Sequence, residues 1–219
     1  MFRTFKYLLA ATALTAGGSA YAQTAIQSFS GGTLFPSFSG GADTVGFAFS
    51  TNSNLQVTSL GWYSTDGSLA SAHQVGIWNS GGSLLGTSTV LPDILPGGVG
   101  FRFSAVTPFN LATGQTYFVG GLDTGADGDD YLTSVSNLVT APQITFIGSA
   151  VASGTGFSFP SSINNVTTGG RFGANFQFTD LGVGVVPEPG TWSLLILGFG
   201  AMGAAMRRQN KTRARVAFA

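Results

Sequence analysis

Few side chains in this sequence are able to carry out acid–base or nucleophilic chemistry. The chain has a single histidine, His73, and no cysteine, which excludes a histidine-based metal cluster, a thiolate zinc site and a cysteine nucleophile. A Ser-His-Asp triad would have to use His73, but no G-x-S-x-G elbow is present and the histidine stands before a predicted strand. We therefore expect a structural His73, hydrogen-bonded at a strand edge, in a protein that is not an enzyme.

Carboxylates offer a second kind of chemistry. Glycoside hydrolysis needs two carboxylates on either side of a cleft, and the body of the chain between residues 23 and 186 contains no glutamate. Its aspartates are densest in one glycine-containing loop, where four of them could give oxygen ligands to calcium: Asp123, Asp127, Asp129 and Asp130. The loop lacks the order of an EF-hand, and we favour a solvated hairpin loop whose Asp and Gly residues serve turn geometry. No other cofactor is expected.

Aromatic side chains offer a third possibility, which is binding rather than catalysis. Trp62, Tyr63 and Trp78 could form a platform on which sugar rings stack. The alternative is core packing, which is the commoner fate of large aromatic residues in a sandwich of strands.

The elements that must position these residues are short strands. Apolar and polar residues alternate in 45–49, 55–60 and 74–78, and most clearly in 171–178, where every second residue is apolar. Glycine-containing turn signals separate these runs, and the body shows no sustained helical period. The pattern predicts an all-β domain at residues 23–182, an antiparallel β-sandwich or jelly roll.

Charge is distributed unevenly along the chain. The only basic residues between residues 23 and 186 are Arg102 and Arg171, against eight aspartates, whereas the stretch after Pro189 is basic and contains no acid. A lysine-free acidic body repels phosphate backbones, so we expect no nucleic-acid partner. Without cysteine the domain has no disulfides, and it must be stabilised by its own core.

The amino-terminal end is typical of a secretory signal peptide at residues 1–22. Two basic residues precede a short apolar run, and Ala20 and Ala22 supply the small side chains that mark cleavage before Gln23. The alternative is a buried amino-terminal helix.

The carboxy-terminal segment, residues 183–219, contains a second apolar run. Pro187, Glu188 and Pro189 precede it, Trp192 lies near its start, and Arg207 and Arg208 stop it. A helix over 190–206 is roughly 25 Å long, slightly less than the ~30 Å hydrocarbon core of a bilayer. The sequence predicts one transmembrane helix with a basic cytoplasmic end at 207–219. A buried core helix is the alternative.

The order of these features resembles the PEP-CTERM sorting tail. Its Pro-Glu-Pro, Trp192, glycine-containing apolar run and final Arg-Arg follow the PEP-x-x-W-A variant, with Ser193 in place of the alanine. The resemblance implies an exported protein that is anchored in the inner membrane and then cleaved by an exosortase-type peptidase, which leaves it at the cell surface or outside the cell. The same tail is also known as the ice-binding protein C-terminal domain, but Thr87-Ser-Thr89 is the only Thr-x-Thr triplet near a predicted strand, so no ice-binding array is expected.

A second resemblance covers residues 60–121. Gly61-Trp-Tyr, Ala72-His-Gln-Val-Gly-Ile-Trp, Gly82-Ser-Leu-Leu and Gly114-Gln-Thr-Tyr follow one another in an order similar to a β-sandwich domain of unknown function in bacterial surface and secreted proteins. This resemblance implies a fold rather than an activity.

Together these features predict a non-enzymatic protein of the envelope or extracellular matrix. PEP-CTERM systems are associated with exopolysaccharide and biofilm, so the resemblance implies exopolysaccharide as a neighbour. A carbohydrate-binding module with a specific glycan is the first alternative, and a secreted hydrolase is the second.

Overall fold

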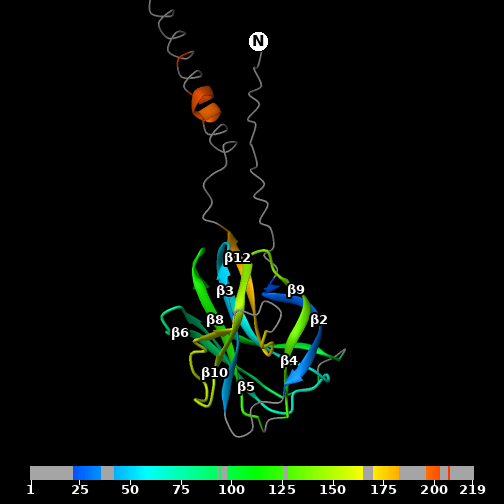
Figure 1. Cartoon of the computed structure of the whole chain (residues 1–219). Coiled ribbons are helices and arrows are strands. Elements are labelled where there is room, and N and C mark those ends of the chain that lie inside the picture. The colour runs from blue at the N-terminus through cyan, green and yellow to red at the C-terminus, as the bar shows by residue number, and fades with distance from the viewer. Residues whose placement is uncertain are drawn as a thin grey trace, which may run out of the picture.

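The computed structural model describes residues 22–35, 42–92, 94, 98–125, 128–164, 170–182, 196–202 and 207. The described residues between 22 and 182 form strands joined by turns and loops (Figure 1). The strands of these described residues are β1 (Gln23–Thr24), β2 (Ile26–Phe35), β3 (Asp43–Thr51), β4 (Asn54–Ser64), β5 (His73–Asn79), β6 (Leu84–Val90), β7 (Gly100–Leu111), β8 (Thr116–Asp123), β9 (Tyr131–Thr140), β10 (Ile144–Ala152), β11 (Ser162–Asn164) and β12 (Ala174–Gly182).

The described strands form two larger sheets and a ribbon. One sheet has the order β1-β12-β4-β7, the other has the order β11-β10-β3-β8-β5-β6, and β2 pairs with β9. The neighbouring strands in these sheets are antiparallel. The prediction of an antiparallel all-β domain is therefore confirmed, whereas the jelly-roll connectivity stays a prediction.

Residues that alternate along the strands fill the space between the two sheets. Phe176 and Phe178 of β12 are fully buried, as are Phe47 and Phe49 of β3 in the facing sheet. The rings of Phe49 and Phe176 lie 4.9 Å apart across the sandwich. Each such buried ring contributes about 1.5–3 kcal/mol relative to an exposed one, so this interior can stabilise the domain without disulfides.

Trp62 lies in a closely packed part of this interior. It is fully buried on β4, and it occupies space left by glycines on neighbouring segments. A Cβ atom at Gly121 on β8 would clash with the Trp62 ring, and a Cβ at Gly173 would lie 2.5 Å from it. The two glycines are therefore required by close approach rather than by backbone conformation.

The loop that follows β10, residues 153–161, covers the outer face of the six-stranded sheet. We call it the 153–161 loop. Phe157 packs on Trp78 with ring centroids 5.1 Å apart, and Phe159 packs on Phe118 at 4.9 Å. Two hydrogen bonds through the Thr44 hydroxyl, to the Gly156 carbonyl and from the Ser158 amide, hold the loop to β3. The outer face thus has a small apolar core of its own.

The strands of the domain run between two ends. β12 ends at Gly182, and β1 pairs with β12 near that point, so we call this the tail end. The opposite end, the distal end, contains the start of β3, the end of β8 and the start of β5. Figure 1 shows the sheets running between these two ends.

Asp180 fastens β12 at the tail end. Its carboxylate accepts hydrogen bonds of 2.8 Å from the Ser53 hydroxyl, the Gln143 amide and the Gly182 main-chain N–H. Burial alone would raise the pKa of this carboxyl, but the three hydrogen bonds outweigh it and hold the pKa below its usual value. Ser53 and Gln143 come from two separate turns, so Asp180 ties three segments together.

In the carboxy-terminal segment the structure describes helical residues 196–202 and residue 207. The side chains of Ile196, Leu197 and Phe199 are 65–68% exposed. Among the described residues, none of the helices is both long enough and apolar enough to cross a membrane. The predicted helix over 190–206 lies largely outside the described residues.

The close approach at Trp62 gives a test of the interior. We expect Gly121→Ala to lower the free energy of unfolding by roughly 1–3 kcal/mol, because the new methyl group overpacks a filled core. Thermal unfolding of the full chain in a mild detergent measures this. Gly81→Ala is the matched control, since its Cβ would meet only the Asn79 side chain at 3.4 Å. Equal melting temperatures for the two variants would show that Trp62 can move aside.

The lowered pKa of Asp180 gives a pH dependence. A carboxyl whose pKa is lower in the folded than in the unfolded chain adds stability above the unfolded value, about 3.9, and loses it as pH falls through the folded value. We expect Asp180→Asn to lower the free energy of unfolding by roughly 0.5–1 kcal/mol at pH 7, since the carboxyl is largely solvated. Urea titrations from pH 7 to pH 2 should show this difference vanish in acid, and a difference that persists at pH 2 would contradict the assignment.

Candidate functional site

His73, the single histidine, is fully buried at the start of β5. Its Nδ1 lies 3.0 Å from the main-chain oxygen of Leu122, and its Nε2 lies 3.0 Å from Asp129 Oδ2. Both ring nitrogens therefore have a hydrogen-bond partner inside the core, and His73 and Asp129 form a buried side-chain pair.

Trp62 covers one face of the His73 ring. The two rings are parallel within 5° and their centroids lie 4.3 Å apart. Stacked aromatic rings of this kind contribute about 0.5–1.5 kcal/mol beyond the area that they bury. Because Trp62 belongs to one sheet and His73 to the other, this stack joins the two sheets.

Asp129 connects His73 to a neighbouring loop. Its carboxylate also accepts hydrogen bonds of 2.9 Å from the main-chain amides of Ala70 and Ser71. A carboxyl group held by two main-chain amides and an imidazole ring has a fixed orientation. Its chemistry is therefore structural: it closes two loops at the distal end over the core.

Two more carboxylates lie beside this pair. Asp43 on β3 and Asp123 on β8 are cross-strand partners, and each is 1% exposed. The register of β5 and β8, in which Val75 faces Gly121, brings His73 next to Asp123 two residues further along. We call Asp43, Asp123 and His73, which share the inner face of three neighbouring strands, the buried polar row.

Loop amides and a phenol complete the surroundings of the row. Asp43 Oδ1 accepts a hydrogen bond of 2.7 Å from the Gly154 amide, and Asp123 Oδ1 accepts one of 3.0 Å from the Gly125 amide. Burial raises the pKa of the Tyr131 phenol; the neighbouring Arg171 guanidinium opposes this rise, and the Asp123 and Asp43 carboxylates add to it. Arg171 also donates to the Ser149 hydroxyl at 3.3 Å.

The row was not predictable as a unit from the sequence. Asp43 was not predicted as a site residue, because a single aspartate before an apolar run is typical of a turn. The predicted calcium loop is divided in the structure: Asp123 belongs to the row, Asp129 binds His73, Asp130 is half-buried, and Asp127 lies outside the described residues. Within the described part of the chain, groups of three or more His, Cys, Asp or Glu side chains able to hold a metal ion are not found. Calcium binding by the predicted loop stays a prediction.

The predicted aromatic platform is also divided. Trp62 is fully buried against His73, and Trp78 is 4% exposed and packs beneath Phe157. Tyr63 is half-buried, with its ring 5.1 Å from Phe29. The three side chains do not share a surface in the structure, and the core-packing alternative describes the two tryptophans.

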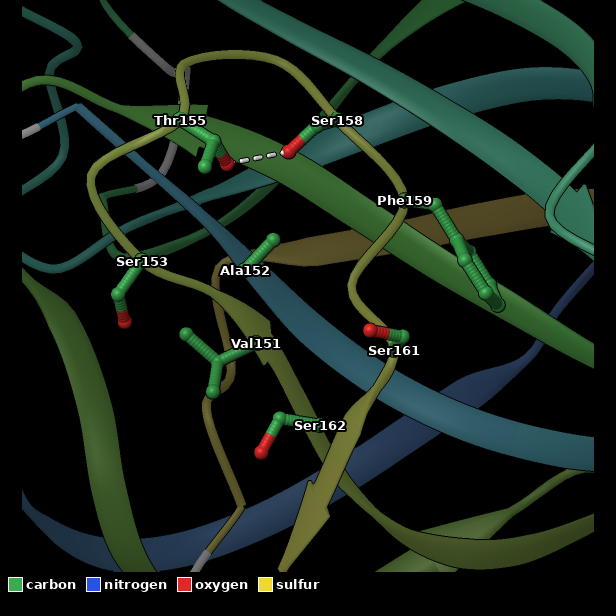
Figure 2. A pocket seen from close by; sticks show the side chains of 8 residues that line it. All are labelled: Val151, Ala152, Ser153, Thr155, Ser158, Phe159, Ser161 and Ser162. Atoms are coloured by element: carbon green, nitrogen blue, oxygen red, sulfur yellow. Dashed lines mark hydrogen bonds between the residues drawn. The ribbon is translucent and has the colours of Figure 1, made fainter.

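A cavity that sequence analysis missed lies under the 153–161 loop. It has a volume of about 510 Å³. Figure 2 shows Thr155 and Ser158 facing each other across the arch of the loop, 2.6 Å apart, with Phe159 to one side. Its lining is rich in hydroxyl groups: Val151, Ala152, Ser153, Thr155, Ser158, Phe159, Ser161 and Ser162. Hydroxyls beside one aromatic ring suit an uncharged polar ligand.

The predicted sorting and cleavage residues lie mostly outside the described residues. This holds for Ala20, Pro187, Glu188, Pro189, Trp192 and Arg208. Ala22 and Arg207 are described, and both are exposed.

The fold and the site define an antiparallel β domain with a buried polar row at its distal end, followed in the sequence by an apolar and basic segment. The chain belongs to the family described as Domain of unknown function (DUF4082), whose model matches residues 34–170. Residues 185–209 match the PEP-CTERM protein-sorting motif, which marks a protein for export and for processing by exosortase, a membrane enzyme. Both resemblances inferred from the sequence are thereby confirmed. No curated protein and no solved structure matches the chain.

The side-chain pair at the distal end can be tested by removing one partner. We expect Asp129→Ala to lower the free energy of unfolding by about 1–3 kcal/mol, because it leaves the buried His73 ring and two main-chain amides without their partner. Asp130→Ala, one residue along and half-buried, is the control and should change stability by less than about 1 kcal/mol. Chemical unfolding gives both values. Amide exchange at residues 70 and 71 should increase in Asp129→Ala alone, and unchanged exchange there would mean that Asp129 does not fasten that loop.

Proposed function

We propose that this protein is a non-enzymatic component of the bacterial envelope or extracellular matrix. In this proposal its tail holds it in the inner membrane until an exosortase-type peptidase cuts near residues 187–189, after which the β domain reaches the cell surface or the surrounding matrix. The observation that supports it most directly is the PEP-CTERM motif at residues 185–209, immediately beyond the end of β12 at Gly182.

The composition of the tail supports anchoring. Its described helical residues, 196–202, expose large apolar side chains, and the exposed Arg207 follows them. Apolar side chains flanked by basic residues are stable in a bilayer with the basic end on the cytoplasmic side. In the proposed orientation a signal peptide at residues 1–22 begins the export of the chain, and the β domain lies on the outer side.

The state of the single histidine supports a non-enzymatic role. Both ring nitrogens of His73 are hydrogen-bonded inside the core, and Trp62 covers one face of the ring. A general base needs a free nitrogen within reach of substrate. His73 does not offer one in this conformation.

The direction of β12 supports an outward-facing distal end. β12 ends at the tail end, and the loops around residues 65–72, 124–125 and 153–161 lie at the opposite end of the domain. Exopolysaccharide, the neighbour that the PEP-CTERM resemblance implies, would meet that end first.

One observation favours carbohydrate binding as the second candidate function. The cavity under the 153–161 loop presents hydroxyl groups and the Phe159 ring, which suit a sugar better than an ionic ligand. A glycan array with the full chain tests this. Saturable binding that is lost in Phe159→Ala and retained in Trp62→Phe would support a specific carbohydrate-binding module. If the chain binds no glycan on the array, carbohydrate binding is contradicted and the matrix-component proposal is retained.

The anchoring proposal is tested by reversing the charge at the end of the apolar run. We expect the double variant Arg207→Glu and Arg208→Glu to move most of the unprocessed chain out of the inner-membrane fraction or to prevent its processing, because the positive-inside preference is lost. The double variant Lys211→Glu and Arg213→Glu, further from the apolar run, is the matched control. Mass spectrometry of the exported protein identifies its first and last residues, and we expect Gln23 to be the first. An intact Met1, or identical fractionation of both double variants, would contradict the proposal.

A further inference from the structure

One carboxylate oxygen of the buried polar row is left without a partner. Asp43 is 1% exposed, and its Oδ1 is bound by the Gly154 amide, whereas its Oδ2 has no hydrogen-bond partner among the described residues. A buried carboxylate keeps its charge only if other groups replace the water it has lost. The Oδ2 atom therefore marks a position where a further group is needed.

The neighbour across the sheet increases this need. Asp123 stands directly opposite Asp43, so their Cβ atoms are about 4.5–5.5 Å apart on the same face of the sheet. Two negative charges this close, both out of water, repel each other strongly. A positive charge placed between them would remove both the repulsion and the unfilled position.

The basic side chains nearby have other partners. His73, beside Asp123, is hydrogen-bonded to Asp129. Arg171 donates to the Ser149 hydroxyl and hydrogen-bonds the Tyr131 phenol. Arg102 donates to the Gly67 main-chain oxygen at 3.4 Å. The structure shows none of these guanidinium or imidazole groups bonded to Asp43 Oδ2 among the described residues.

We propose that Asp43 and Asp123 hold a divalent cation of the calcium type at the distal end of the core. The two carboxylates supply charged oxygens, and calcium accepts flexible shells of six to eight oxygens that include water and main-chain carbonyls. Two carboxylates are enough for such a site when neutral oxygens complete the shell. Zinc would require nitrogen or sulfur ligands, which the row does not direct at Asp43. This site differs from the predicted loop site, because it uses Asp43 and does not use Asp130.

The proposed cation would also fix the loops of the distal end. Asp43 holds the Gly154 amide and Asp123 holds the Gly125 amide, so an ion that orders both carboxylates orders both loops. The 153–161 loop forms most of the lining of the open, hydroxyl-rich pocket (Figure 2). Calcium binding would therefore stabilise the shape of that pocket. This inference does not depend on the sorting tail or on the proposed matrix role.

Calorimetry of the full chain in a mild detergent tests the site. After treatment with EGTA and dialysis, the wild-type chain is titrated with CaCl₂, and its melting temperature is measured with and without 5 mM CaCl₂. We expect one ion per chain with a Kd of about 10⁻⁵ to 10⁻³ M, the range of sensor and extracellular sites, and a higher melting temperature with calcium. Asp43→Asn should weaken binding at least tenfold, and Asp130→Asn should change it less than twofold.

Terbium provides a readout that needs only the wild-type chain. Tyr131 lies within electrostatic reach of both carboxylates, so terbium at this site should emit on tyrosine excitation, and calcium should quench the emission by displacement. Tyr131→Phe should reduce the emission without abolishing calcium binding. If Asp43→Asn does not fold, Asp123→Asn and the terbium measurement decide the question.

Three results would overturn the proposal. The first is the absence of calcium heat, thermal shift and calcium-sensitive terbium emission in the wild-type chain. The second is loss of binding in Asp130→Asn with binding retained in Asp43→Asn, which would place the ion in the loop. The third is an Asp43→Asn chain more stable than a calcium-insensitive wild type, which would show that the two carboxyls share a proton.

Discussion

The stack of Trp62 on His73 is the contact on which the distal half of the domain depends. It is a contact between the two sheets, with ring centroids 4.3 Å apart, and it occupies space that exists only because Gly121 and Gly173 lack side chains. The same histidine binds the Leu122 main chain and Asp129, and Asp129 binds the loop at Ala70 and Ser71. Packing, charge and loop position are therefore coupled through one imidazole ring.

The distribution of polarity inside the sandwich follows from this coupling. Near the tail end the interior is aromatic, with Phe49 against Phe176, and it is stabilised by area removed from water. At the distal end the inner face carries Asp43, Asp123 and His73, whose burial is tolerated because loop amides and other hydrogen-bond partners surround most of their polar atoms. These polar residues fix the register of β3, β8 and β5, because a slip by one residue would turn them to the other face of the sheet.

The sequence indicates the strands well and the site poorly, for a physical reason. Alternation in 171–178 correctly places Phe176 and Phe178 on a buried face, since period two is a local property of the chain. The partnership of Asp43 with Asp123 depends on the pairing of β3 with β8, which joins residues 80 positions apart and leaves no local trace. The role of the tryptophans was ambiguous because the sequence pattern of a strand is the same whether its aromatic residue faces a sugar ligand or the core. Strand β2 was missed because Gly31 and Gly32, both at positive φ, interrupt its pattern.

The position of β12 has a mechanical consequence. The strand lies between β1 and β4 and ends at Gly182. Hydrogen bonds in an antiparallel ladder run across the strand axis, so a pull on the chain beyond Gly182 loads the bonds to both neighbours at the same time instead of opening them one after another. Strands loaded in shear resist tension because many hydrogen bonds must break together. The hydrogen bonds of Asp180 to Ser53 and Gln143 add to this resistance at the point of attachment.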